Sequence, residues 1–157
     1  NVKAHYETTA VEILNDMDHV DAFVAGIGTG GTISGVGKRL KEVYKDALVY
    51  AVEPKKSPLL TEGVAGSHGI QGIGANFVPK ILNRDIIDEI ITVADEEALE
   101  TARLLGTKEG VFCGISSGAN VYAALMVARK LGPGRKVVTV LPDTGERYLS
   151  TALFKEE

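Results

Sequence analysis

Residues 26–32 read Gly26-Ile27-Gly28-Thr29-Gly30-Gly31-Thr32 and join a short apolar segment to a segment with helical periodicity. Glycines at such a junction let the backbone turn sharply and approach a ligand closely. The first turn of the following helix offers unpaired N–H groups and a partial positive charge. The stretch is therefore typical of a phosphate-binding loop between a strand and a helix, and Thr29 and Thr32 add hydroxyl donors.

Short apolar segments rich in β-branched residues recur on both sides of this loop. Several are hydrophobic along nearly their whole length, which is typical of strands in a parallel sheet that is covered on both faces. The predicted strands are Asp21–Ile27, Ala47–Val52, Glu89–Val93, Val111–Ile115 and Lys136–Leu141.

Segments with a helical repeat separate these strands. The predicted helices are an opening helix with Ala10, Ile13, Leu14 and Met17 on one face, a helix over Gly31–Tyr44, a helix that follows Asp95 as its N-cap, and a helix that ends at Gly132-Pro133-Gly134. Alternation of this kind predicts an α/β fold, with a mainly parallel open sheet and helices on both faces. We expect residues 1–157 to form one domain.

A glycine-rich segment between Glu53 and Arg84 interrupts the alternation and has no clear period. In a compact α/β domain, a loop of this length is more often a functional surface than a simple connection. The segment is therefore a second candidate for ligand contact.

Composition limits the classes of function. The chain has 157 residues, 45% of them hydrophobic, and a formal charge of −4, so nothing indicates attraction to nucleic acid or to a membrane surface. No apolar run approaches the roughly 20 residues that span a bilayer, and no signal peptide is visible. A single cysteine, Cys113, excludes an internal disulfide framework and favours a reducing compartment, so we expect a cytoplasmic protein.

The glycine loop alone leaves the kind of phosphate open. Gly26, Gly28 and Gly31 match the dinucleotide pattern G-x-G-x-x-G, and Glu53 stands about 20 residues further on, where a ribose-binding carboxylate is expected. A P-loop is excluded because no Gly-Lys-Ser/Thr closes the motif. A glycine-rich turn without any ligand is the remaining alternative.

Three further segments accompany the loop in order along the chain. They are His68-Gly69-Ile70-Gln71-Gly72-Ile73-Gly74-Ala75, Gly114-Ile115-Ser116-Ser117-Gly118-Ala119 and Pro142-Asp143-Thr144-Gly145-Glu146-Arg147-Tyr148-Leu149-Ser150-Thr151. Together with Gly28-Thr29-Gly30-Gly31-Thr32 they resemble the cysteine synthase (O-acetylserine sulfhydrylase) family in order and approximate spacing, over essentially the whole chain. The resemblance implies the C-terminal domain of a two-domain, fold-type II enzyme that depends on pyridoxal 5′-phosphate.

The resemblance also implies roles for individual residues. Gly28, Thr29, Gly30, Gly31 and Thr32 would bind the cofactor phosphate, and Ser116 would place its hydroxyl at the pyridine nitrogen. Gln71, Gly72 and Ile73 would line the substrate side, and Asp143 is a second-rank candidate near the ring. The implied reaction is a β-replacement that makes L-cysteine from O-acetyl-L-serine and sulfide. A cystathionine β-synthase-like enzyme, another lyase of the same fold, and a non-catalytic binding domain remain alternatives.

One part of the family's machinery has no match in these residues. Family members are about twice as long, and their N-terminal half carries both the lysine that forms a Schiff base with the cofactor and the Thr-Ser-Gly-Asn loop that holds the substrate carboxylate. We therefore expect no catalytic residue within residues 1–157 and no turnover by this chain alone. The resemblance further implies a homodimer for the full-length enzyme and a possible complex with the C-terminal tail of serine acetyltransferase.

The remaining reactive residue types have simpler interpretations. Cys113 is expected to be a small apolar residue of a buried strand, because nothing basic stands beside it in sequence. His5, His19 and His68 lack metal-ligand spacing and are expected at the surface, although the position of His68 before Gln71 leaves a place in the cleft open. We therefore predict no metal site.

Overall fold

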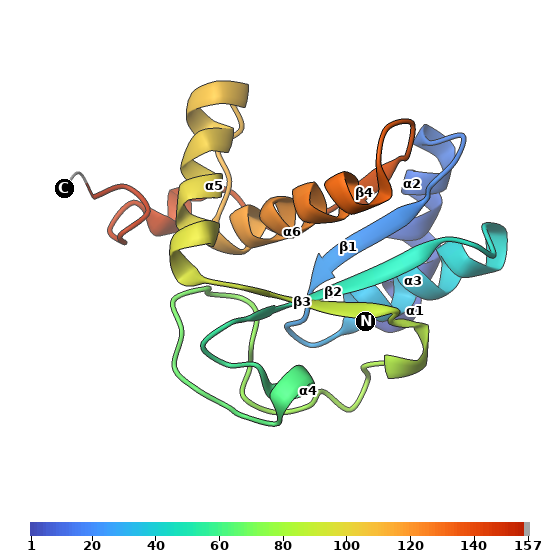
Figure 1. The fold of residues 1–157 in the computed structure, drawn as a ribbon, viewed down its shortest axis with the longest axis horizontal. Coiled ribbons are helices and arrows are strands. Elements are labelled where there is room, and N and C mark those ends of the chain that lie inside the picture. The colour runs from blue at the N-terminus through green and yellow to red at the C-terminus, as the bar shows by residue number, and fades with distance from the viewer. Residues whose placement is uncertain (156–157) are drawn as a thin grey trace.

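The computed structural model describes residues 1–155 as a four-stranded parallel sheet between helices (Figure 1). The strands are β1 (Ala22–Gly26), β2 (Leu48–Pro54), β3 (Glu89–Val93) and β4 (Val137–Thr139). They are arranged in the order β3-β2-β1-β4, and every pair of neighbours is parallel. The predicted α/β class and the parallel sheet are confirmed.

The opening helix and α3 pack against one face of the sheet. The opening helix is continuous through α1 (Val2–Ala4), η1 (His5–Thr9) and α2 (Ala10–Asp16), and α3 covers Gly31–Val43. The buried cluster on this face joins sheet residues such as Phe23 and Val49 to Ile33, Val36 and Leu40 of α3. This is the apolar repeat that predicted the helix.

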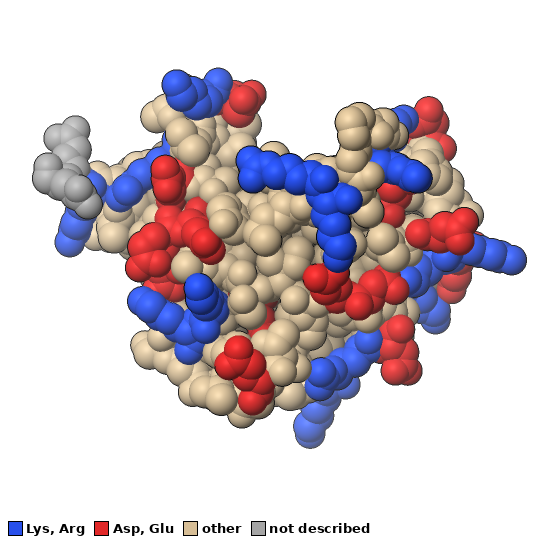
Figure 2. All heavy atoms as spheres, in the orientation of Figure 1, with Lys and Arg blue, Asp and Glu red and all other residues tan. Residues whose placement is uncertain are grey.

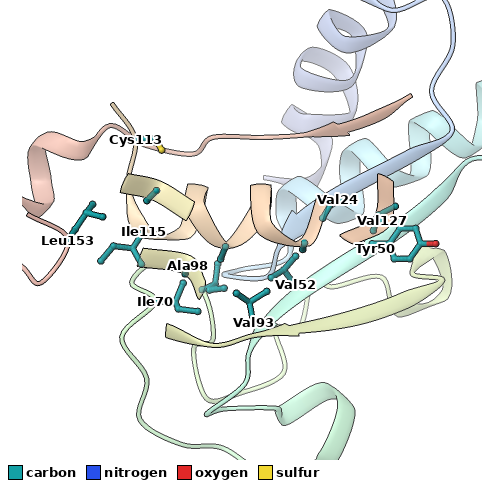
Figure 3. Packing of buried hydrophobic residues seen from close by; sticks show 14 of the residues in the cluster. Val24, Tyr50, Val52, Ile70, Val93, Ala98, Cys113, Ile115, Val127 and Leu153 are labelled. Carbon is teal, nitrogen blue, oxygen red and sulfur yellow. The ribbon is translucent and has the colours of Figure 1, made fainter. Parts of the chain in front are cut away.

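The other face is covered by α6 (Ile115–Leu131), against which α5 (Asp95–Glu109) packs. Val24 and Val52 of the sheet, Ala98 of α5 and Ile115 of α6 belong to the cluster buried on this side (Figure 3). The two helices approach closely at Gly118, where an added Cβ would lie 2.1 Å from the carbonyl oxygen of Ala98. The helix–helix contact therefore depends on a residue without a side chain.

The predicted strand at Val111–Ile115 is wrong. Only an isolated antiparallel bridge between Cys113 and Thr144 forms there, and the segment joins the end of α5 to the start of α6. Gly110, with φ of +68°, ends α5, and α6 begins at Ile115. The few intervening residues connect two packed helices and have no place in the sheet, so Cys113 is buried without strand pairing and Phe112 remains exposed.

The N-terminus of α5 differs from the prediction by one residue. Ala94, not Asp95, is the N-cap, and its N–H donates to Oε2 of Glu97 at 2.8 Å. The carboxylate of Asp95 is consequently free to bind elsewhere.

The long segment before β3 is almost entirely irregular, as predicted. It contains only α4 (Leu59–Glu62) and the short helix η2 (Arg84–Ile86), and η3 (Gly145–Tyr148) lies near the other end of the chain. None of the helices described is long and apolar enough to cross a membrane. On the face in Figure 2, side chains of both charge signs are interspersed, so this face has no extended patch of one sign.

Candidate functional site

A cavity of about 310 Å³ opens at the carboxyl end of β1. The chain leaves β1 through α3 toward β2, whereas β4 joins β1 on its other side, so the carboxyl ends of β1 and β4 flank a switch in strand order. In open parallel sheets such a switch point is where ligands bind. The cavity is lined by Ala25, Gly26, Gly28, Thr29, Gly30, Gly31, Thr32, Gly72, Ile73, Ser116, Asn120, Val140, Pro142, Asp143 and Arg147.

The glycine loop forms one wall of the cavity. Gly30 has φ of +86°, in the left-handed region that favours glycine, and α3 begins at the next residue. Within residues 1–155, the N–H groups of Gly28, Thr29 and Gly30 have no acceptor in the chain. Together with the free N–H groups of the first turn of α3, they form a set of donors suited to an anion.

Both threonine hydroxyls of the loop contact the first residues of the chain, Asn1 and His5. Oγ1 of Thr29 accepts a hydrogen bond from Nδ2 of Asn1 at 2.9 Å, and Oγ1 of Thr32 lies 3.3 Å from Nε2 of His5. Because the Thr29 oxygen accepts from Asn1, its own proton remains available to a ligand.

The segment around Gly72 packs directly on this loop. An added Cβ on Gly28 would lie 2.6 Å from the carbonyl oxygen of Gly72, and one on Gly26 would lie 2.7 Å from Cγ2 of Ile73. Gly72 itself has φ of +97°, and its added Cβ would point toward Oγ of Ser116 at 3.7 Å. Gly72 and Ile73 thus bridge the glycine loop and the first turn of α6.

Ser116 and Asn120 lie one helical turn apart on α6, and both are buried. The side-chain N–H of Asn120 donates to the carbonyl oxygen of Val140 at 2.9 Å, whereas its Oδ1 has no hydrogen-bond partner in the described chain. Asp143 also has one buried oxygen, Oδ1, without a partner. Buried polar atoms are normally paired, so each of these two residues of the cavity wall retains an oxygen that can accept a further hydrogen bond.

Two residues near the cavity have raised pKa values. Burial, a hydrogen bond to Asp143 and the negative charge of that carboxylate raise the pKa of Tyr148 to about 12. Burial, together with the same charge, raises the pKa of the Cys113 thiol. Cys113 is 3% exposed, so the structure shows the inert, buried thiol that was expected, although outside a strand.

The structure brings together most of the residues predicted for the site. The loop Gly28–Thr32, Gly72, Ile73, Ser116 and Asp143 all line the cavity, but Gln71 is exposed and does not. The cavity wall also contains residues to which the sequence assigned no role, namely Ala25, Asn120, Val140, Pro142 and Arg147. The spacing of Asn120 from Ser116 on a predicted helix was a usable signal for one of them.

The position of Glu53 contradicts the ribose-binding role considered for it. Its carboxylate is buried and accepts hydrogen bonds from the N–H groups of Leu60 at 2.9 Å and Thr61 at 3.1 Å and from the Thr61 hydroxyl at 2.6 Å. It therefore caps α4 and does not line the glycine-loop cavity. The dinucleotide interpretation therefore lacks the ribose-binding carboxylate that it requires.

Comparison with protein families matches residues 1–143 to the pyridoxal-phosphate dependent enzymes. The chain belongs to this family. Pyridoxal phosphate is the cofactor of its members, and the cavity fits such a group: N–H donors without an acceptor lie in the glycine loop, glycines leave its wall without side chains, and the lining residues Asn120 and Asp143 each have an unpaired oxygen.

Individual relatives narrow the comparison. The chain is 59% identical to cysteine synthase B of Campylobacter jejuni, over 98% of this chain and 51% of that protein. Among solved structures, O-acetyl serine sulfhydrylase isoform 3 of Entamoeba histolytica matches with a TM-score of 0.94 and 43% identity, over 99% of this chain and 47% of that chain. The O-acetylserine dependent cystathionine β-synthase of Helicobacter pylori matches with a TM-score of 0.93 and 40% identity, over 98% and 50% respectively. This chain therefore spans about half the length of these relatives.

Proposed function

We propose that this chain is the cofactor-binding domain of a cytoplasmic cysteine synthase that makes L-cysteine from O-acetyl-L-serine and sulfide. The observation that carries the proposal is the cavity at the end of β1, where the glycine loop, Gly72, Ile73 and Ser116 converge. The identity of 59% to cysteine synthase B of Campylobacter jejuni supports this activity over others in the family.

The glycine loop would hold the cofactor phosphate. The free N–H groups of Gly28, Thr29 and Gly30, the start of α3 and the Thr29 hydroxyl supply donors without a competing protein acceptor. The helix N-terminus adds a favourable partial charge for a dianion. Arg147 at the cavity wall adds a positive charge.

Ser116 would place its hydroxyl at the pyridine nitrogen. When bound, pyridoxal phosphate supplies an electron sink for bond changes at the carbons of an amino-acid substrate. A neutral hydroxyl at the ring nitrogen, unlike a carboxylate, does not hold that nitrogen protonated. An unprotonated ring nitrogen limits how strongly the cofactor can withdraw electrons. This favours elimination and β-replacement over transamination.

Gly72 and Ile73 would close the substrate side of the cavity, and Gln71 would reach it when their loop moves. Ile73 contributes an apolar side chain that helps to exclude water, and Gly72 leaves space next to Ser116. Asp143 would lie near the ring, with one carboxylate oxygen held by Tyr148.

The covalent anchor and the base would come from outside residues 1–157. Among the described residues, no lysine lines the cavity. We expect the 157-residue chain to bind pyridoxal phosphate reversibly. Borohydride reduction followed by mass spectrometry is expected to show no covalently attached cofactor, and covalent attachment to a lysine of this chain would contradict the assignment.

Cofactor binding is tested with a matched pair of variants. Ser116→Ala removes a hydroxyl that faces the cavity, whereas Ser117→Ala removes a buried hydroxyl next to it that does not line the cavity. Calorimetric titration with pyridoxal phosphate is expected to show binding to the wild type, binding weakened roughly tenfold in Ser116→Ala, and little change in Ser117→Ala. Equal affinities in all three proteins would remove Ser116 from the site.

The reaction is tested by joining this chain to the N-terminal half of cysteine synthase B of Campylobacter jejuni. The chimera is expected to convert O-acetylserine and sulfide to cysteine, and Ser116→Ala is expected to lower this activity. A preference for homocysteine over sulfide would instead favour a cystathionine-forming enzyme, a candidate supported by the match to the Helicobacter pylori protein. A folded chimera without either activity would count against both.

The partners follow from the same proposal. The full-length enzyme would act as a homodimer on small-molecule substrates, and the C-terminal tail of serine acetyltransferase would bind in the cleft that both halves form. We expect weak or no binding of such a tail peptide to this chain alone. Tight binding in a calorimetric titration would show that the second half is not required.

A further inference from the structure

We infer that His68 is a positioning residue whose imidazole ring closes the segment 68–74 into a defined turn and so presents Gly72 and Ile73 to the cavity. The inference rests on the proposed cofactor site, but the turn itself can be examined without the cofactor. Neither the surface position expected for His68 nor a direct place in the cavity wall describes what the ring contacts.

Both ring nitrogens of His68 bind the backbone of its own turn. Nδ1 accepts a hydrogen bond from the N–H of Ile70 at 3.1 Å, and Nε2 lies 2.9 Å from the carbonyl oxygen of Gly74. Because an amide N–H can only donate, Nδ1 must be unprotonated. Nε2 therefore carries the proton and donates to Gly74, and the two contacts specify one neutral tautomer.

The turn needs such support because its backbone is unusual. Gly72 and Gly74 both have positive φ, at +97° and +65°. Among the described residues, its main chain forms one hydrogen bond to main chain outside the turn, from the N–H of Gly74 to the carbonyl oxygen of Ile27 at 3.0 Å. A loop with so few main-chain bonds depends on side chains for a single conformation.

The start of the turn is anchored separately by Asp95 and Ile70. Oδ2 of Asp95 accepts from the N–H of Gly69 at 3.0 Å, and it also pairs with Nζ of Lys56 at 3.0 Å. Ile70 is fully buried in the cluster that contains Val93 (Figure 3). The start of the turn is thus tied to the sheet and α5, and His68 ties its end back to its start.

The turn that His68 closes contacts the cavity wall at two places. The carbonyl oxygen of Gly72 lies against Gly28, and the side chain of Ile73 lies against Gly26. If the His68 ring is removed, these two residues lose one of the constraints that hold them on the glycine loop. The cavity then loses part of one wall, although no residue that lines it has changed.

The test combines hydrogen exchange with cofactor binding in three substitutions at one position. His68→Ala removes both bonds and is expected to speed amide exchange in residues 68–74 roughly tenfold or more and to weaken pyridoxal phosphate binding several-fold. In His68→Asn the side-chain oxygen takes the place of Nδ1, so protection of the Ile70 amide is expected to return. In His68→Gln the side-chain nitrogen takes the place of Nε2, so only the contact to Gly74 is expected to return.

Matched controls separate the turn from general stability. Lys56→Ala removes the ion pair to Asp95 but leaves the bond to Gly69, and His19→Ala changes an exposed histidine far from the turn in sequence. Neither is expected to alter exchange in residues 68–74. Unchanged exchange in His68→Ala, or equal acceleration in Lys56→Ala, would overturn the inference.

A measurement on the unmodified protein covers the case in which the variants fail to fold. ¹⁵N NMR of the histidine rings is expected to show His68 at neutral pH with an unprotonated Nδ1 and a proton on Nε2. The opposite tautomer cannot accept from Ile70 and would overturn the inference. Failure of the wild type to bind pyridoxal phosphate would count against the proposed function and leave the exchange and tautomer results to decide the role of His68.

Discussion

The phenol hydroxyl of Tyr148 donates a hydrogen bond to the carboxylate of Asp143. Tyr148 is 4% exposed and belongs to η3, whereas Asp143 lines the glycine-loop cavity. The contact links the turn that follows β4 to the site. It also holds one oxygen of Asp143, while the second oxygen stays unpaired within the described chain.

This relationship predicts a loss of stability at alkaline pH. The pKa of Tyr148 is raised from 10.0 to about 12 in the folded protein, so folding favours the neutral phenol. The resulting stabilisation is complete below pH 10 and is lost as the pH rises from about 10 toward 12, with a slope of about 1.4 kcal/mol per pH unit. Tyr148→Phe is expected to remove this part of the slope, as measured by urea unfolding between pH 8 and about 11.5. Identical slopes in the two proteins would show that the phenol titrates normally.

Gly28 is expected to tolerate no side chain. The Cβ of Gly28→Ala would lie 2.6 Å from the carbonyl oxygen of Gly72, which belongs to the backbone and cannot rotate away. The turn would have to shift, so we expect loss of pyridoxal phosphate binding by tenfold or more, as measured by titration. Gly106→Ala lies on α5, away from the loop, and serves as the control with unchanged binding. Normal binding by Gly28→Ala would show that the turn is not held against the loop.

Two helical glycines are predicted to respond in opposite directions. In Gly118→Ala the new Cβ would lie 2.1 Å from the backbone oxygen of Ala98, so α5 and α6 would have to move apart. The free energy of unfolding should therefore fall by about 1–3 kcal/mol. At Gly106 the nearest atom to an added Cβ is 3.9 Å away, so Gly106→Ala should stabilise the protein by about 0.5–1 kcal/mol through helix propensity and a restricted unfolded chain. Denaturant unfolding midpoints compare the stability of the two variants with that of the wild type. A rise in the midpoint of both variants would mean that the contact between the helices is looser than the structure shows.

Glu53 is predicted to act in folding and not in nucleotide binding. Glu53→Ala leaves the N–H groups of Leu60 and Thr61 without their acceptor and should lower the free energy of unfolding by about 3 kcal/mol. Glu62→Ala, an exposed change on the same short helix, should stay within about 0.5 kcal/mol. Adding NAD to the wild type should not raise its melting temperature, whereas pyridoxal phosphate should. Protection by NAD would reopen the dinucleotide interpretation.

Several features of the fold could be predicted because local signals carry them. The apolar runs that became β1, β2 and β3 were found within two residues of their observed ends, and α3 within one. The segment Val111–Ile115 could not be assigned correctly, since a short buried apolar run looks the same whether it pairs in a sheet or joins two helices. Only the packing of α5 on α6 leaves that segment outside the sheet.

Some residues of the candidate site could likewise be predicted from local motifs, and others could not. The glycine loop and Ser116 carried a motif, whereas Asn120 lines the cavity without one, and Arg147 lies within a motif segment that assigned it no role. Glu53 stands at the distance from the glycine loop that is expected of a ribose-binding carboxylate. Its carboxylate nevertheless caps α4, because the chain after β2 brings that helix next to it. The role of His68 was equally hidden, since its partners are backbone groups that every residue carries.

The sequence by itself determined that a strand, a glycine loop and a helix N-terminus follow one another in the chain, and it carried enough motifs to indicate the enzyme family. These properties depend on neighbouring residues: the φ of +86° at Gly30, the apolar runs, and the free N–H groups at the start of α3. Only the tertiary structure decided which distant segments complete the site. The contact of Gly72 with Gly28 and the place of Ser116 beside them depend on the strand order β3-β2-β1-β4 and on how α6 packs across the sheet. Such long-range packing is encoded by no local pattern.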